Sequence, residues 1–177
     1  NVQALATTDV LSGPLQLLRP DVPTLLVSFG RSGGSPESVA VVELAERLLR
    51  DCHQLIITCN EQGSLYQRCR DRRGSLALLM PPETHDQSFA MTSSFTSMML
   101  AAWLAFSQGA VSPGDLAQIA DGARALLLRH NGTLREFAAR NYSRVVFLGS
   151  NALKAIAREA ALKLLELTDG QVVAAHE

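Results

Sequence analysis

The sequence predicts an α/β protein built on a doubly wound parallel sheet. Short apolar runs that fit buried parallel strands occur at residues 24–28, 55–58 and 75–80. Segments with helical spacing of apolar residues alternate with these runs, as in βαβ units. The order of strand, Gly/Ser turn and helix at residues 24–50 recurs at residues 144–168. The recurrence indicates two related half-units, each of which starts its own sheet.

The composition is that of a globular protein. The chain has 177 residues, of which 47% are hydrophobic and 5% aromatic, and its formal net charge is −1. It has no basic stripe and no apolar run of membrane-spanning length, so we expect no nucleic-acid or membrane partner. The three cysteines, Cys52, Cys59 and Cys69, lack CxxC spacing, and we expect them to be reduced in a cytoplasmic protein. No residue set has convincing metal-ligand spacing, and we expect neither a metal nor a cofactor.

The sequence reads as a segment of a longer protein, because it starts at Asn1 and its first residues, 2–8, already resemble a strand. We predict a first domain at residues 1–108 that lacks its first strand. A helical linker at residues 109–143 and the beginning of a second domain at residues 144–177 follow. A fragment with exposed sheet edges should seek a partner, which favours a homodimer or larger assembly.

Two helix starts are predicted within the linker. Ser112 is placed to cap a helix that begins at Pro113 and ends near Arg129. Thr133 and Glu136 have the spacing of a capping box, which predicts a second, short helix.

The first candidate site is the turn from Gly30 to Ser35. It follows the strand at residues 24–28, and Pro36 suits the first position of the helix that comes next. Glycines that allow tight turns, serine hydroxyls, free backbone N–H groups and the positive end of a helix meet here, which suits a phosphate. The turn lacks the lysine of a P-loop and the G-x-G-x-x-G spacing, which argues against a nucleotide. An ordinary βα turn is the alternative.

The second candidate site is a charged helix face formed by Glu159, Lys163 and Glu166. Salt bridges on a solvated surface are one explanation. However, apolar residues flank the charged stripe on both sides, which favours a pocket or an interface. A carboxylate on such a face would be partly desolvated, as suits a general base.

Three segments resemble the sugar isomerase (SIS) domain family. Residues 31–38 resemble its S-x-S-G-x-[ST] phosphosugar loop, although Gly30 replaces the first hydroxyl. Residues 90–96 resemble its A-S-T-x-x-F-T segment, with Met91 in place of serine. Residues 158–166 resemble the L-E-G-A-L-K-x-x-E helix of the isomerase half of glucosamine-6-phosphate synthase. The resemblance implies flavodoxin-like α/β sandwiches in tandem.

The resemblance also implies roles for individual residues. Glu166 matches the family's proton-shuttling base, and Glu159 and Lys163 match the glutamate and lysine that precede it. The family's ring-opening histidine belongs to an H-G-P motif, which this sequence does not contain. From these segments we predict a set of phosphate ligands: Arg31, Ser32, Gly33, Ser35, Ser64, Thr92, Ser93 and Thr96.

Within the family, residues 28–33, 58–61, 83–86, 89–94 and 165–168 resemble the bacterial tagatose-6-phosphate ketose/aldose isomerases, also described as galactosamine-6-phosphate deaminase/isomerases. This implies a homodimeric enzyme that transfers a proton between C1 and C2 of a hexose or hexosamine 6-phosphate. The sequence does not choose between isomerisation and deamination. The rival interpretation is a non-catalytic regulatory SIS domain that senses a phosphosugar.

Overall fold

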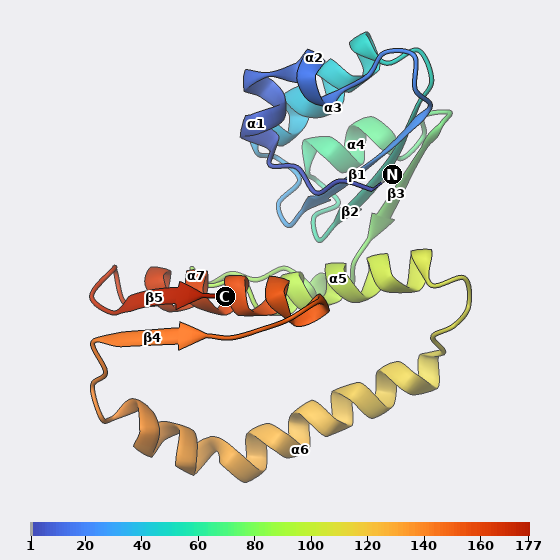
Figure 1. Ribbon diagram of the computed structural model, residues 1–177. Coiled ribbons are helices and arrows are strands. Elements are labelled where there is room, and N and C mark those ends of the chain that lie inside the picture. Colours follow the sequence, from blue (N-terminus) through green and yellow to red (C-terminus); the bar gives the residue numbers. More distant parts are fainter. Residues whose placement is uncertain (1) are drawn as a thin grey trace. The chain divides into compact units, whose positions relative to one another are not determined.

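The computed structural model describes residues 2–177, which form two compact units divided between Ser107 and Gln108. Figure 1 shows the order of elements along the chain. Each unit has its own parallel sheet, and the two sheets share no strand. The α/β fold class predicted from the sequence is confirmed. The subdivision of the second unit into a linker and a domain stays a prediction.

The first sheet has the strand order β1-β2-β3, with β1 at Thr24–Gly30, β2 at Cys52–Thr58 and β3 at Ser75–Leu79. All pairings are parallel. The crossover from β1 to β2 contains α3 (Pro36–Leu48), and the crossover from β2 to β3 contains α4 (Ser64–Cys69). The carboxyl ends of β1 and β2, and hence the loops that follow them, therefore lie side by side.

The core of the first unit lies between one face of this sheet and α3 and α4. Ile56 of β2 is fully buried and belongs to one cluster with Val42, Leu65 and Cys69. A second cluster joins α3 to the preceding helices, α1 (Thr7–Ser12) and α2 (Pro14–Leu17). Its buried members are Val10, Leu18, Val41, Ala45 and Leu49.

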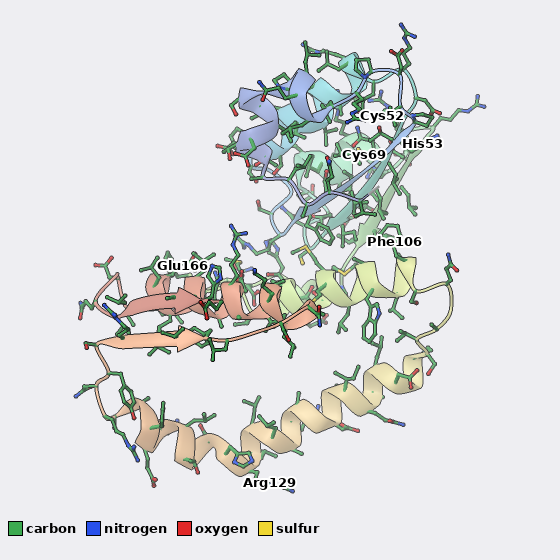
Figure 2. The ribbon with its side chains drawn as sticks, in the orientation of Figure 1. Cys52, His53, Cys69, Phe106, Arg129 and Glu166 are labelled. Carbon is green, nitrogen blue, oxygen red and sulfur yellow. The ribbon has the colours of Figure 1, made fainter. Side chains whose placement is uncertain are left out.

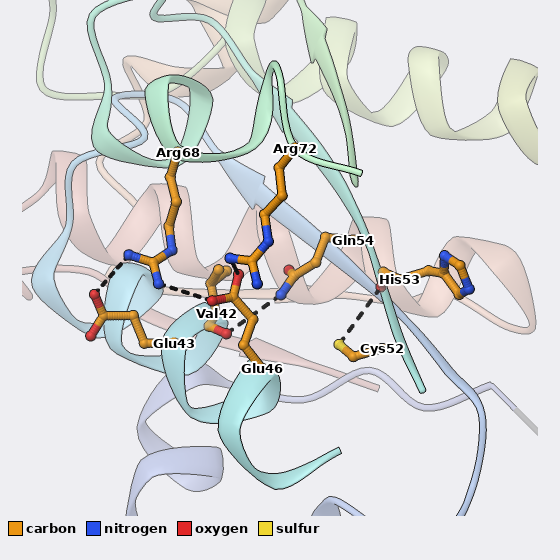
Figure 3. Close-up of polar contacts among 8 residues, drawn as sticks. All are labelled: Val42, Glu43, Glu46, Cys52, His53, Gln54, Arg68 and Arg72. Carbon is orange, nitrogen blue, oxygen red and sulfur yellow. Dashed lines mark hydrogen bonds and ion pairs between the residues drawn. The ribbon is translucent and has the colours of Figure 1, made fainter. Parts of the chain in front are cut away.

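An ion-pair cluster also links α4 and the residues after it to α3 (Figure 3). Arg68 lies 3.0 Å from a carboxylate oxygen of Glu43 and 2.9 Å from one of Glu46, and Arg72 lies 2.6 Å from the other oxygen of Glu46. Burial raises the pKa of Glu46, but hydrogen bonds from the two guanidinium groups outweigh burial, and the pKa is lowered overall. Glu46 is therefore held ionised between two cations.

After β3 the chain passes through a 3₁₀ turn, η1 (Pro82–Thr84), into α5 (Ser93–Phe106). The second unit then contains α6 (Pro113–Ala138), β4 (Arg144–Phe147), α7 (Ala152–Leu167) and β5 (Val173–His176). The strands β4 and β5 pair in parallel around the α7 crossover. No helix among residues 2–177 combines the length and apolar character needed to cross a membrane.

The strand predicted at residues 2–8 and the bounds predicted for the linker helices are wrong. Residues 2–8 do not form a strand: α1 begins at Thr7, because Val10 donates its N–H to Ala6 and its side chain is buried in the cluster with α3. The helix that begins at Pro113 does not end near Arg129, and the capping box at Thr133 starts no helix, since α6 runs without a break to Ala138. Continuing i→i−4 hydrogen bonds satisfy the same donors as a cap would.

The cap predicted at Ser112 is confirmed. Its side chain accepts the N–H of Asp115, and the Asp115 carboxylate accepts the N–H of Ser112, which completes a reciprocal capping box.

Candidate functional site

The turn after β1 is held by the end of β2 and the start of α4. Thr58 donates its hydroxyl to the carbonyl of Gly30 at 2.6 Å, and the side-chain amide of Asn60 donates to the carbonyl of Ser32 at 2.9 Å. The N–H of Leu65 donates to the carbonyl of Gly33 at 2.8 Å. Gly33 is buried with φ +59°, a conformation that favours glycine. The turn is thus fixed both by its own glycine at position 33 and by donors from the end of β2, the loop after it and the start of α4.

The close approach of the two loops depends on Gly63. A Cβ atom at this position would lie 2.4 Å from the carbonyl oxygen of Ser32 and 3.0 Å from Cα of Gly33. Any larger residue must therefore push the turn after β1 away from the start of α4. Sequence reasoning missed Gly63, although a glycine directly before Ser64 is a signal of close backbone approach.

Most of the serines predicted to bind phosphate lie at helix starts. Ser35 occupies the N-cap of α3, and its hydroxyl lies 3.4 Å from that of Ser38 without capping the helix. The hydroxyl of Ser32 accepts the N–H of Gly34 at 3.4 Å. Ser64 is the exposed first residue of α4. Because β1 and β2 are adjacent, the structure brings these three serines to the same end of the sheet.

Arg31, in the turn after β1, contacts the loop before α5. Its guanidinium donates to the main-chain carbonyl of Asp86 at 2.7 Å, and its own carbonyl accepts the N–H of Cys59 at 3.2 Å. Arg31 therefore joins three segments: the turn after β1, the end of β2 and the loop before α5.

The start of α5 is occupied by an internal anion. The carboxylate of Asp86 accepts the backbone N–H groups of Thr92, Ser93 and Ser94 at 2.8, 3.2 and 2.9 Å. It also accepts the hydroxyls of Ser94 at 2.7 Å and Thr92 at 3.1 Å. The hydroxyl and amide of Ser94 hold the pKa of Asp86 far below its ordinary value. The Thr96 hydroxyl donates to the carbonyl of Thr92.

Asp86 was not among the residues predicted from sequence. The roles of Thr92, Ser93 and Thr96 as phosphate ligands stay predictions, and the amides of the first two already have an acceptor. The available signal was an aspartate six residues before a hydroxyl-rich helix start. Its spacing is too long for a capping box, so only the fold of the intervening loop reveals the contact.

On α7, the charged face predicted from the sequence is present, and Glu166 is labelled in Figure 2. The ammonium of Lys163 lies 2.5 Å from a carboxylate oxygen of Glu166 and 3.6 Å from one of Glu159. The three side chains are 24–31% exposed. The hydrogen bond to Glu166 raises the pKa of Lys163, which keeps the ammonium charged. The face therefore carries one cation between two carboxylates.

The two groups of predicted residues lie in different units, the phosphate ligands before Gln108 and the charged face after it. Among residues 2–177, no three His, Cys, Asp or Glu side chains lie close enough together to form a metal site.

Comparison with protein families matches residues 2–108 to the SIS domain. The chain belongs to this family. It is 52% identical over 176 residues to the D-galactosamine-6-phosphate deaminase AgaS of Shewanella sp. strain ANA-3, covering 99% of the chain and 45% of that protein. It is 47% identical to a putative D-galactosamine-6-phosphate deaminase of Streptomyces coelicolor, covering 99% of the chain and 46% of that protein. The chain thus spans about half the length of these relatives.

Solved structures agree with this assignment. The crystal structure of tagatose-6-phosphate ketose/aldose isomerase from Escherichia coli superposes with a TM-score of 0.90 at 45% identity, covering 99% of this chain and 48% of that one. Glucosamine-6-phosphate deaminase from Thermotoga maritima superposes with a TM-score of 0.70 at 18% identity, covering 96% of this chain and 49% of that one, and shares the fold. The SIS resemblance noted in the sequence is confirmed.

Proposed function

We propose that the full-length protein is an aminosugar-phosphate deaminase and aldose–ketose isomerase that converts galactosamine 6-phosphate to tagatose 6-phosphate. The observation that carries this proposal is the 52% identity, over nearly the whole chain, to a D-galactosamine-6-phosphate deaminase. The turn after β1, braced by Asn60 and Leu65, supports it because a preformed Gly/Ser turn at a helix start suits a phosphate.

We assign the C1/C2 proton transfer to Glu166, because it matches the position of the family's proton-shuttling base. Its carboxylate takes the proton from C2 of the open-chain aldose and returns it to C1 through an enediol- or enolamine-like intermediate. With an amino sugar the product is a C2 ketimine. Water adds at C2 of the ketimine and ammonia leaves, which gives the ketose phosphate and makes the overall deamination hydrolytic. Lys163 holds Glu166 in place through the 2.5 Å ion pair, and Glu159 in turn orients Lys163.

The phosphate of the substrate binds at the other site. Hydroxyls of Ser32, Ser35 and Ser64 contact its oxygens, and Arg31 supplies positive charge. Gly33 adds backbone contacts, and Thr92, Ser93 and Thr96 stand on the α5 side of the site. The protein acts as a homodimer in the cytoplasm.

The test uses the full-length protein with galactosamine 6-phosphate, measuring ammonia and tagatose 6-phosphate together. Glu166→Gln should lower kcat by about 10²–10⁴ and leave KM nearly unchanged, since it removes a proton-transfer group and keeps the shape. Glu159→Gln is the matched control and should lower kcat less. Full activity in Glu166→Gln would contradict the assignment. Tight binding of the sugar phosphate by the wild type without any turnover would favour the regulatory SIS domain instead.

A further inference from the structure

We propose that Asp86 is a positioning residue for substrate phosphate, acting through Arg31 and not by touching the substrate. The inference rests on the proposed phosphate site and adds to it a residue that no relative's name or motif assigns. It starts from one observation: the side chain and the main-chain carbonyl of Asp86 are hydrogen-bonded to different parts of the fold. The carboxylate is bound by α5, and the main-chain carbonyl is bound by Arg31.

The carboxylate end is the more tightly held. Five donors from the N-cap residue Thr92 and the first two residues of α5 converge on its two oxygens, three from the backbone and two from hydroxyls. One of the hydroxyls belongs to Ser94, which is fully buried. A carboxylate at a helix N-terminus is also favoured by the helix dipole. Asp86 therefore has little freedom to move relative to α5.

The carbonyl end transmits this position to the turn after β1. Arg31 donates to the Asp86 carbonyl at 2.7 Å across 55 residues of sequence. Arg31 is also the residue directly before Ser32, and its own carbonyl is tied to β2 through Cys59. With main chain and side chain both anchored, the guanidinium stays beside the turn where the phosphate is proposed to bind. A long, flexible side chain would otherwise lose rotamer entropy on binding.

The negative charge of Asp86 has a second consequence. Two helices of more than ten residues, α3 and α5, follow the carboxyl ends of strands of the first sheet. The N-terminus of each helix could attract an anion. Asp86 neutralises the one at α5 and takes the amides of Thr92 and Ser93. These two amides are therefore already occupied, and any contact of Thr92 or Ser93 with a substrate phosphate must come from elsewhere on these residues.

The experiment compares Asp86→Asn with Asp115→Asn in the full-length protein. Asp115 is the matched control, since it also caps a helix N-terminus with its carboxylate but makes no contact with Arg31. Both substitutions should lower Tm, because each weakens the cap of a helix. Only Asp86→Asn should also weaken binding of tagatose 6-phosphate, by about tenfold, as expected when a charge-assisted hydrogen-bond network is loosened. kcat should change much less than KM.

A double-mutant cycle with Arg31→Ala tests the route. Asp86→Asn should add little to the loss already caused by Arg31→Ala, because both remove the same restraint. Fully additive losses would overturn the inference, as would an Asp86→Asn variant that changes Tm but not binding. Should Asp86→Asn fail to fold, Ser94→Ala removes one of its donors, and unchanged binding in that variant would overturn the inference as well. A wild-type protein that does not bind tagatose 6-phosphate would refute the proposed function itself, and the inference with it.

Discussion

The two strand–turn–helix units differ in how their turns are supported. The turn from β1 to α3 accepts hydrogen bonds from Thr58, Asn60 and Leu65, all of which belong to neighbouring segments. The turn from β4 to α7 is held mainly by its own helix start, where Leu153 donates to Ser150. One further bond comes from outside the helix: the N–H of Gly149 donates to the carbonyl of Glu177, which follows β5.

The comparison separates local sequence from tertiary support. Both turns carry a glycine and a serine after a short apolar strand, and their sequences predict the same local geometry. Only the first has a third strand beyond its neighbour and a buried cluster beneath it. A binding turn that must hold its shape without ligand needs such bracing, because each ordered residue costs about 1–2 kcal/mol in backbone entropy.

The largest contrast should appear in the two sheets. In the 177-residue chain, Ile56→Ala should lower the free energy of unfolding by about 2–5 kcal/mol, because Ile56 is fully buried. Val146 of β4 is 52% exposed, and Val146→Ala should change the free energy of unfolding by about 0.5 kcal/mol or less. Urea unfolding followed by circular dichroism measures both. An equal loss in the two variants would mean that the outer side of β4 is covered, and would remove the contrast.

The next contrast concerns two glycines: Gly63, in the loop after β2 that packs against the turn from β1 to α3, and Gly149, in the turn from β4 to α7. A Cβ at position 63 would lie 2.4 Å from the carbonyl oxygen of Ser32, and one at position 149 would lie 2.3 Å from that of Leu153. Each alanine substitution should cost about 1–3 kcal/mol in stability, since the backbone must shift. In the full-length enzyme, Gly63→Ala should raise KM, because it displaces the phosphate turn.

Gly149→Ala should instead lower kcat, because it disturbs the start of the helix that carries Glu166. Steady-state kinetics of both variants separates the two effects. If both variants changed KM alone, the separate roles proposed for the two turns would be wrong.

The smallest contrast is in pH dependence. The pKa of Glu46 is lowered on folding, so its ion pairs stabilise the protein above the ordinary value of 4.5 and are lost as the pH falls through the lowered value. The pKa of Lys163 is raised, so its contribution is present below the ordinary value of 10.5 and is lost as the pH rises through the raised value.

Thermal unfolding of two variants across pH checks the signs. The difference in Tm between wild type and Glu46→Gln should shrink toward acid pH. The difference between wild type and Lys163→Gln should shrink only at strongly alkaline pH. A Glu46→Gln difference that persists at pH values well below 4.5 would show that the cluster with Arg68 and Arg72 does not depend on its charge.

Patterns within a few residues of one another predicted much of this molecule. Short apolar runs located the strands of the first sheet. Only β2 is mostly buried among the residues described; Leu25 of β1 and Leu76 of β3 are about half exposed, so the expectation that all three runs are buried strands holds for β2 alone.

The spacing of Glu159, Lys163 and Glu166 placed three charges on one face of α7, because neighbours on a helix depend only on its period. The cap at Ser112 could be predicted for the same reason, since Ser112 and Asp115 are three residues apart. These features could be read because their partners lie three or four residues away.

The tertiary structure alone decided the rest. The contacts of Arg31 with Asp86 and of Gly63 with Ser32 join residues 55 and 31 positions apart, and nothing in their local sequence marks the partner. Residues 2–8 alternate loosely like a strand, yet residues 2–6 are exposed without regular structure, and α1 begins at Thr7 because Val10 is buried against α3. The residue types that suit a phosphate are local. The geometry that holds them, and the carboxylate that occupies the α5 N-terminus, depend on which loops the parallel sheet brings to one end.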